Sequence, residues 1–362
     1  MTAEVNRTKK VAILIEQHFE DSEFQIPYQA LQEAGAEVTV LGSRMNEKYA
    51  GKQGKASVEP DGTTTESLAE DFDAVIIPGG MAPDKMRTNM KTVRFVQDAV
   101  EQNKLVAAVC HGPQVLIEGD LLRGKRATGF RAIRKDMQNA GAEFVDEWLV
   151  EDGNLITSRR PGDLPVFATA ILHRLGLSTK ETALGDALNA DWWKLGEAWG
   201  GSSKSEIADA INTAIRGEHY ALHAFEKYEE KATDEELRQV FGEIVKAKRL
   251  HIQRLESRLK ALGEQETFQA TASGAYATLK SWLQSSDDVS ILRRSLGDLQ
   301  TGAVDAFNLC NSITDPTTAA IFDEIEVEIA KHETRVADLY HARTQKARVK
   351  AATPTTGTAT SA

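Results

Sequence analysis

In the stretch Leu105-Val106-Ala107-Ala108-Val109-Cys110-His111-Gly112-Pro113, five apolar residues end in a cysteine, a histidine and two residues that favour a turn. This pattern predicts a buried strand that passes directly into a helix. In an open parallel sheet such a junction lies at the carboxyl edge, where α/β folds bind their ligands, and beside the positive end of the next helix. A thiol there is expected to ionise readily, so Cys110 is a candidate nucleophile; the alternative is a buried structural cysteine.

Short apolar runs alternate with amphipathic stretches from Val11 to about Leu177, which is typical of βαβ units on a parallel sheet. Strands are expected at residues 11–15, 37–41, 73–77, 105–109, 127–129, 143–145 and 155–158. Helices are expected over 21–35, 91–102 and 163–175, and a hairpin or loop over 43–65. The prediction is an α/β domain with a doubly wound parallel sheet over residues 9–177, preceded by a tail of residues 1–8.

From about Ser205 the apolar residues recur with helical periodicity in four long segments, which predicts an all-α four-helix bundle over residues 204–346. Residues 178–203, which include three tryptophans, are expected to form a connector. The stretch 262–290 suits the single long crossover of ferritin-like bundles. Residues 347–362 are predicted to be disordered because of their composition.

The composition of the whole chain limits the classes of function. A chain of 362 residues exceeds what one hydrophobic core usually serves, so two domains are expected. A formal net charge of -11 argues against a nucleic-acid or anionic-membrane partner, because either would need a basic face. No apolar run approaches the roughly 18 to 20 residues that cross a bilayer, and the start MTAEVNRTKK lacks the apolar core of a signal peptide.

The two cysteines, Cys110 and Cys310, fall in different predicted domains, so no disulfide framework is expected. A reducing compartment suits this pattern, and we expect a cytoplasmic protein. No G-x-G-x-x-G fingerprint follows the first predicted strand. We therefore predict no dinucleotide cofactor. No other cofactor is predicted either.

A nucleophilic cysteine needs a partner that moves protons and backbone amides that stabilise the developing oxyanion. His111 follows Cys110 directly, although neighbouring side chains on a turn do not have to contact each other. Glu20 and Glu23 come just after the first strand, at the same predicted sheet edge. The alternative role for either glutamate is compensation of the helix dipole, worth about 0.3 to 1 kcal/mol. The expected backbone donors to the oxyanion are Gly79, Gly80 and Gly112.

Four motifs, in chain order, carry a resemblance to a known family: HFEDSEFQIP at 18–27, PGGMAPD at 78–84, AVCHGPQ at 108–114 and TSRRPGDL at 157–164. Together they resemble the PfpI branch of the ThiJ/PfpI superfamily, and the likeness covers nearly all of residues 9–177. The resemblance implies a flavodoxin-like sheet of the class I glutamine amidotransferase-like type and a reactive cysteine at Cys110. It also implies an acid beside the thiolate, for which Glu23 is the first choice and Glu20 the second.

The same resemblance implies a homo-oligomer in which a carboxylate from a neighbouring subunit contacts and orients the histidine of the site. Asp84 stands at that position, where the family pattern has glutamate, so its side chain is one methylene shorter. Phe130 stands where such proteins can carry a tyrosine near the pocket.

The function implied by the resemblance is that of a stress-related cysteine hydrolase. Family members include intracellular peptidases and enzymes that act on methylglyoxal or on its adducts with proteins, and both chemistries begin with thiolate attack on a carbonyl. The expected substrate is a small carbonyl compound or a peptide. The alternative is a non-enzymatic redox sensor or protein-binding module that uses the same thiol, with the bundle as an oligomerisation or partner surface.

The helical segment resembles ferritin-like domains of the rubrerythrin kind over roughly residues 205–345. In such bundles one glutamate from each of two helices joins a Glu-x-x-His pair from each of the other two. The positions retained are Glu218, His251 and His332, and those replaced are Lys248, Gln300 and Ile329. Because one glutamate cannot neutralise two divalent ions, no metal is predicted.

The lysine at a former ligand position suggests a different arrangement. We expect the Lys248 ammonium to occupy the space of a metal charge and to pair with Glu218. His251 and His332 are then hydrogen-bonded core residues. The alternative is an altered single-metal site that uses Glu326 or Glu328, which neighbour the missing position.

Overall fold

The computed structural model describes residues 7–179, 191–266 and 287–352. The chain forms two compact units: Met1–Ile207 with Asn311–Ala319, and Ala208–Cys310 with Ala320–Ala362. Within the described residues, no helix combines the length and the apolar character needed to cross a membrane.

A seven-stranded sheet forms the centre of the first unit, in the order β10-β11-β7-β6-β1-β2-β5. Its strands are β1 (Lys10–Leu14), β2 (Glu37–Gly42), β5 (Gly62–Thr63), β6 (Ala74–Ile77), β7 (Leu105–Val109), β10 (Leu149–Asp152) and β11 (Leu155–Ser158). All neighbouring pairs are parallel except β10 with β11. The predicted parallel α/β sheet is confirmed, and β10 is an antiparallel edge strand that the sequence pattern does not predict.

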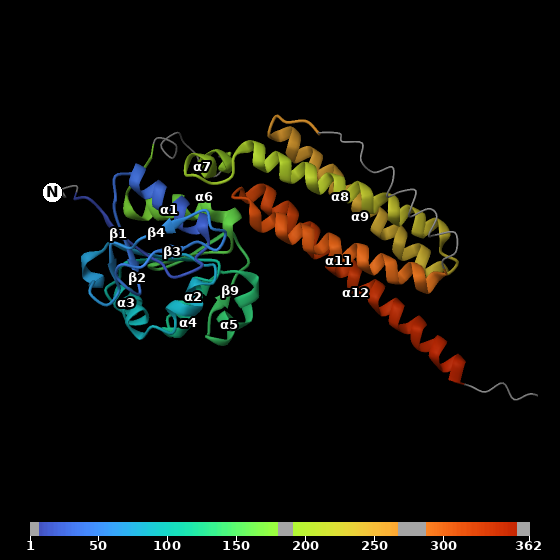
Figure 1. Ribbon diagram of the computed structural model, residues 1–362, viewed down its shortest axis with the longest axis horizontal. Coiled ribbons are helices and arrows are strands. Elements are labelled where there is room, and N and C mark those ends of the chain that lie inside the picture. The colour runs from blue at the N-terminus through green and yellow to red at the C-terminus, as the bar shows by residue number, and fades with distance from the viewer. Residues whose placement is uncertain (1–6, 180–190, 267–286, 353–362) are drawn as a thin grey trace, which may run out of the picture. The chain divides into compact units, whose positions relative to one another are not determined.

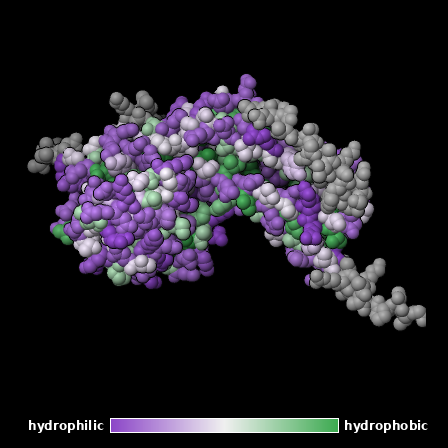
Figure 2. All heavy atoms as spheres, in the orientation of Figure 1, coloured by the Kyte–Doolittle hydropathy of each residue, from purple (hydrophilic) through white to green (hydrophobic). Residues whose placement is uncertain are grey.

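Helices cover both faces of this sheet (Figure 1). On one face α1 (Asp21–Glu33) packs against α6 (Leu164–Leu175), and on the other lie α3 (Met90–Glu101) and α4 (Pro113–Glu118). The central strands are continuous apolar runs because both faces are covered, which is the doubly wound arrangement. The outer surface of this unit is mostly hydrophilic in the view of Figure 2.

Short elements fill the connections of the first unit. A hairpin of β3 (Tyr49–Ala50) and β4 (Ser57–Val58) lies in the predicted excursion. The predicted strands near 127 and 143 pair with each other, as β8 (Arg126–Ala127) and β9 (Glu143–Phe144), and do not join the main sheet. The remaining elements are the helices α2 (Ala82–Met86) and α5 (Arg134–Asn139) and the 3-10 turns Ala69–Asp71, Arg131–Ile133 and Pro161–Asp163.

The predicted connector is partly structured. It contains α7 (Trp192–Ala198), which packs on α6, and it places the fully buried side chain of Trp199 in the core of the first unit. Its residues 180–190 lie outside the described chain.

Four long helices, α8 (Lys204–Lys231), α9 (Glu235–Ala261), α11 (Asp288–Ser312) and α12 (Pro316–Ala352), form the helical region. The predicted all-α bundle is confirmed. Most of its predicted crossover, residues 267–286, lies outside the described residues. Helix α12 continues to Ala352, beyond the predicted end of the bundle at residue 346, and the rest of the predicted tail is not described.

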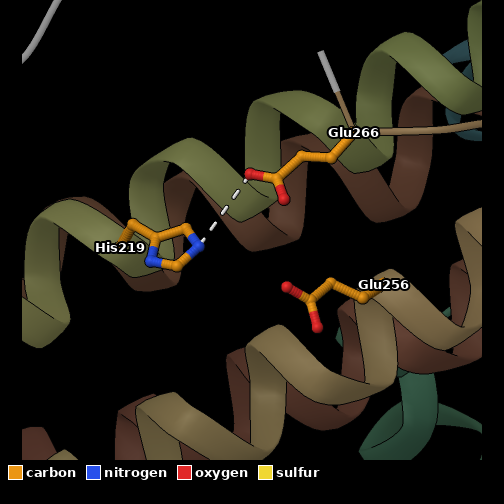
Figure 3. A group of neighbouring side chains, drawn as sticks. All are labelled: His219, Glu256 and Glu266. Carbon is orange, nitrogen blue, oxygen red and sulfur yellow. Dashed lines mark ion pairs between the residues drawn. The ribbon is translucent and has the colours of Figure 1, made fainter. Parts of the chain in front are cut away.

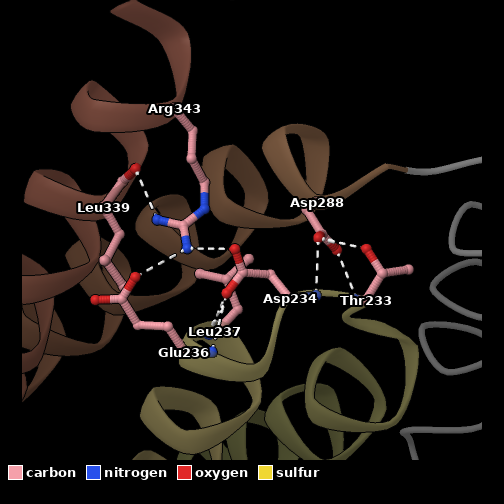
Figure 4. A network of polar contacts seen from close by, with 7 residues as sticks. All are labelled: Thr233, Asp234, Glu236, Leu237, Asp288, Leu339 and Arg343. Carbon is pink, nitrogen blue, oxygen red and sulfur yellow. Dashed lines mark hydrogen bonds and ion pairs between the residues drawn. The ribbon is translucent and has the colours of Figure 1, made fainter. Parts of the chain in front are cut away.

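Polar contacts from two other helices fix the turn between α8 and α9 (Figure 4). Asp234 caps α9 by accepting hydrogen bonds from two amides of its first turn, at 2.9 and 3.3 Å. Its other oxygen accepts from Arg343 of α12 at 2.7 Å. Asp288 of α11 accepts from the backbone and the hydroxyl of Thr233, at 2.9 and 2.6 Å. One turn therefore joins all four helices.

We expect Asp234→Ala to loosen the first turn of α9, because it removes the helix cap and one carboxylate partner of Arg343. The cost should be about 1 to 2 kcal/mol of local stability. Hydrogen exchange read by mass spectrometry should show faster exchange of the amides at 235–238. The matched control is Asp338→Ala, at an exposed position of α12; equal exchange in the two variants would show that the cap contributes nothing.

Candidate active site

Cys110 lies at the junction of β7 and α4, where the sequence predicts it. Its backbone φ of 59° is in the left-handed region, which residues other than glycine rarely adopt. Two hydrogen bonds hold this conformation: the Cys110 N–H donates to the Ser158 carbonyl at 3.0 Å, and the Phe130 N–H donates to the Cys110 carbonyl at 2.8 Å. A strained backbone held by its neighbours in this way is common at functional sites.

His111 contacts the thiol in spite of its adjacency in the sequence. Cys110 Sγ and His111 Nδ1 are 3.3 Å apart. The imidazole packs on the Phe130 ring, with the centroids 5.0 Å apart. Burial lowers the pKa of His111, and the charge of Asp84 opposes this only in part. The imidazole is therefore neutral at pH 7 and able to accept the thiol proton.

Asp84 influences His111 of its own chain through its charge. It lies exposed on α2, and within the described chain no hydrogen bond joins it to the imidazole. The contact from a neighbouring subunit that the resemblance implies stays a prediction.

Glu23 is the buried acid of the site. It lies in the first turn of α1 with no exposed surface, and its Oε2 accepts a hydrogen bond from the Gly79 N–H at 2.6 Å. Burial, reinforced by the charge of Glu20, raises the pKa of Glu23 to about 8. Its Oε1 is buried without a regular hydrogen-bond partner, and the Cys110 thiol is near enough to influence the titration of this carboxyl. At pH 7 the carboxyl therefore carries a proton that it can share with the thiol.

Glu20 has partners of its own. Its carboxylate accepts hydrogen bonds from Lys52 Nζ at 3.2 Å and from Gln53 Nε2 at 2.7 Å. Burial opposes the charged form of Lys52, but Glu20 outweighs this effect and the pKa of Lys52 is raised. Asp21 fixes the same loop by accepting three backbone N–H groups of residues 53, 55 and 56 at 2.7 to 2.8 Å. Glu20 thus acts on the site through its charge.

The thiol does not ionise readily while Glu23 is ionised. Burial raises the pKa of Cys110, the negative charge of Glu23 raises it further, and a hydrogen bond from the Gly80 backbone opposes both. This corrects the expectation that a thiol at the strand-to-helix junction ionises readily, because that expectation did not consider the charge of Glu23. A proton on Glu23 removes the charge that opposes the thiolate, so the two groups titrate as a pair.

Two glycines allow the loop after β6 to approach the elbow. A Cβ at Gly79 would lie 2.7 Å from the His111 nitrogen and 2.8 Å from Glu23 Oε2. Gly80 has a φ of 75°, and a Cβ there would lie 2.5 Å from the Glu20 nitrogen. A side chain at Gly79 would push Glu23 away from the elbow, and one at Gly80 would displace the backbone of residues 18–20.

The expected set of oxyanion donors needs correction. The Gly79 N–H donates to Glu23, and the Gly112 N–H donates to the Val109 carbonyl at 2.7 Å inside the elbow turn. Neither amide is available to a substrate oxygen. Of the three predicted donors, Gly80 is the one whose amide faces the thiol.

The bundle interior holds the lysine arrangement that the sequence predicts. Lys248 Nζ lies 2.9 Å from Glu218 Oε1, and both side chains are buried. His251 Nδ1 lies 2.9 Å from Glu218 Oε2, and His251 Nε2 lies 2.9 Å from Glu328 Oε2. Burial opposes the charged form of Glu218, but Lys248 and His251 outweigh it and lower its pKa. His251 is thus a hydrogen-bonded core residue.

The other former ligand positions do not converge on this cluster as carboxylates. Ile329 is buried and apolar. Gln300 is exposed on α11, so it does not stand at the interior position where the sequence predicts a ligand. His332 is half-buried, and burial lowers its pKa against the opposing charge of Glu328.

A different group of side chains has metal-ligand geometry in the described residues. His219 of α8, Glu256 of α9 and Glu266 offer ligand atoms that lie within 4.8 Å of one another (Figure 3). All three side chains are exposed, and an ion pair of 4.0 Å joins His219 to Glu266. We assign no metal to this group. The sequence holds no ligand spacing that would have found it, because the residues come from distant positions.

Two families match the chain. Residues 9–174 match the DJ-1/PfpI family, and residues 206–314 match a domain of unknown function, DUF2383. General stress protein 18 of Bacillus subtilis is 44% identical over 160 residues, which cover 44% of this chain and 93% of that protein. Protein/nucleic acid deglycase 2 of Escherichia coli is 44% identical over 170 residues, which cover 47% of this chain and 99% of that protein.

A crystal structure shares the two-domain arrangement. It is that of a two-domain protein with DJ-1/ThiJ/PfpI-like and ferritin-like domains from Anabaena variabilis, 56% identical to this chain, with a TM-score of 0.86. The match covers 98% of this chain and 99% of that chain.

The raised pKa of Glu23 predicts a pH-dependent stability. Because the folded-state pKa of about 8 exceeds a glutamate's ordinary value of 4.5, stability contributed by the protonated carboxyl is fully present below pH 4.5 and is lost as pH rises towards 8. We expect the free energy of unfolding of Glu23→Gln minus that of the unmodified chain to rise across this window, by at most about 1.4 kcal/mol per pH unit.

Urea unfolding followed by tryptophan fluorescence at several pH values measures this difference. Glu33→Gln, on the exposed side of the same helix, is the matched control and should show no such slope. A flat difference for Glu23→Gln would mean that the acid is ionised in the folded protein at neutral pH.

Proposed function

This chain belongs to the DJ-1/PfpI family, and from that premise we propose that it is a cysteine-dependent hydrolase in which Cys110 attacks a carbonyl carbon. The observation that carries the proposal is the arrangement at the elbow: a thiol on a left-handed backbone, 3.3 Å from a neutral imidazole and beside a buried acid. The substrate class is a small carbonyl compound or a peptide.

The first step uses four groups of this chain: the Cys110 thiol, His111, the Gly80 amide and Glu23. His111 Nδ1 takes the thiol proton, and the thiolate sulfur forms a bond to the carbonyl carbon while the C=O π electrons move to the oxygen. The Gly80 amide donates to the sulfur before the attack. Once the sulfur has bonded to carbon, this amide can donate to the oxyanion instead. The proton then passes from the imidazolium to the oxyanion or to a leaving amine. Glu23, protonated at pH 7, stabilises the thiolate before the attack.

Two reactions share this step. With an aldehyde such as methylglyoxal, or with its adduct on an amine, the product of the attack is a hemithioacetal or a related tetrahedral adduct. With a peptide, loss of the amine gives a thioester that water hydrolyses. The name of the Escherichia coli relative supports the deglycase-type reaction, and the name of the Bacillus relative supports a role in stress.

We also propose a cytoplasmic homo-oligomer in which Asp84 of one subunit orients His111 of another. The exposure of Asp84 on α2 supports this, because an exposed carboxylate is available to a second copy.

Replacement of the nucleophile tests the proposal. Cys110→Ala should reduce consumption of methylglyoxal, or cleavage of a fluorogenic peptide, by a factor on the order of 10³ or more. Cys310→Ala, the other cysteine and a buried residue of α11, is the control and should keep the rate. Turnover of methylglyoxal would indicate the deglycase-type reaction, and cleavage of the peptide would indicate a peptidase. An absence of turnover with both substrates, together with ready oxidation of Cys110, would support a redox sensor instead.

The roles of the two glutamates separate in a second test. Glu23→Gln should lower the rate by about 10² or more, because an amide N–H is a weaker hydrogen-bond donor to the thiolate than a carboxylic O–H. Glu20→Gln should have a smaller effect, because Glu20 is bound by Lys52 and Gln53. The readout is kcat against pH, in which Glu23→Gln should also remove a titration near pH 8. Equal losses in the two variants would contradict the assignment of Glu23 as the acid.

A further inference from the structure

The helical bundle contains a cavity that the proposed chemistry does not use. Its volume is about 370 Å³, within the range of small-molecule sites in proteins. All four described helices line it, and all its lining residues belong to the second unit. Exposed polar residues of α8 and α11 stand at its mouth: Thr213, Thr301, Asp305 and Asn308. The cavity is therefore reached from solvent between these two helices.

The cavity exists because many of the residues that line it are small. Gly217 and Ala221 of α8 face the cavity, as do Gly302 and Ala306 of α11. Gly217 is exposed at the opening, and a Cβ added there would meet no atom within 4 Å. Protein interiors are normally packed without voids of this size, because each void loses dispersion contacts. A bundle that served only as a scaffold would be more stable with larger apolar residues at these positions.

A buried ammonium with unused donors is part of the cavity lining. Lys248 lines it and is 3% exposed. An ammonium has three N–H donors, and within the described part of the chain Glu218 is the one acceptor that this group reaches. The Glu218 carboxylate is bound on both oxygens, by Lys248 and by His251. Two donors of Lys248 are thus left for a molecule in the cavity.

The charges around the cavity favour a neutral molecule. Its lining holds three acids, Glu218, Asp298 and Asp305, and one cation, Lys248. Glu218 forms an ion pair with Lys248. Asp298 forms an ion pair with Arg294 at 3.5 Å and accepts a hydrogen bond from the Tyr228 hydroxyl at 2.6 Å. A ligand carboxylate would add an unmatched negative charge beside these acids. A ligand ammonium would be repelled by Lys248, whose donors need an acceptor.

We propose that this cavity binds a small neutral molecule with an apolar body and one carbonyl group. The carbonyl oxygen accepts hydrogen bonds from the free N–H groups of Lys248. The apolar body lies against the small residues of α8 and α11. This site is separate from Cys110, and its occupancy does not depend on the proposed hydrolase activity.

Three probes of equal length test the charge requirement: hexanamide, hexanoate and hexylammonium. Isothermal titration of the full chain with each should show binding of hexanamide and weaker or no binding of the two charged probes. Lys248→Met, which keeps the length and loses the donors, should weaken hexanamide binding by about tenfold or more, the effect of losing one hydrogen bond to a charged group.

A cavity-filling variant keeps the test independent of the buried ion pair. Gly217→Leu places a side chain in the open space and replaces a helical glycine, so it should fold at least as well as the unmodified chain and should lose hexanamide binding. Its matched control is Gly297→Leu, at an exposed helical glycine that does not line the cavity and whose Cβ also meets no atom within 4 Å. This control should bind hexanamide normally.

Three outcomes would overturn the proposal. The first is no binding of hexanamide up to its solubility limit, which would show that the cavity is not a binding site for a molecule of this class. The second is tighter binding of hexanoate or hexylammonium, which would reverse the charge argument. The third is unchanged binding in Gly217→Leu, which would place the ligand elsewhere. Each result is independent of whether Cys110 supports turnover.

Discussion

The hydrogen bond from the Gly79 N–H to the buried Glu23 carboxyl is the interaction on which the active-site geometry depends. It is 2.6 Å long and ties the start of α1 to the loop after β6. Glycine is required at that loop position because a Cβ would meet both His111 and Glu23. The same burial that makes the bond possible raises the pKa of Glu23. Geometry and protonation at the thiol thus follow from one contact.

Most of the fold could be predicted from the sequence because the central strands are buried on both faces. Runs such as residues 74–77 and 105–109 are apolar at every position, and a run of this kind has few alternatives to a parallel strand. The edge strand β10 gave no such signal, since Val150 is the one residue of the four that is fully buried. The pairing of β8 with β9 outside the main sheet depends on tertiary contacts that a local pattern does not contain.

The site was less predictable because it depends on distances of a few ångströms. The motifs placed Cys110, His111 and the two glutamates at one sheet edge, but the choice between Glu20 and Glu23 depends on the direction of each side chain at the start of α1. In the structure Glu20 points to Lys52 and Gln53, which come from an excursion whose path the sequence did not define. The amides of Gly79 and Gly112 were assigned to the oxyanion because their acceptors, Glu23 and Val109, could not be known. The exposed position of Gln300 likewise shows that a helical register inferred by resemblance can be off by part of a turn.

Each unit buries a glutamate, and the two units stabilise it in opposite ways. Among the described residues of the α/β unit, Glu23 has one amide donor and no cation in contact, so burial dominates and the carboxyl keeps its proton. In the bundle Glu218 has the Lys248 ammonium and His251 in contact, so it stays ionised although it is almost as deeply buried. His251 lies between Glu218 and Glu328, and each of its ring nitrogens is 2.9 Å from an oxygen of one of these carboxyls. Because the lysine is part of the chain, Glu218 has its cationic partner within the protein itself, and this carboxylate stays charged in the bundle interior.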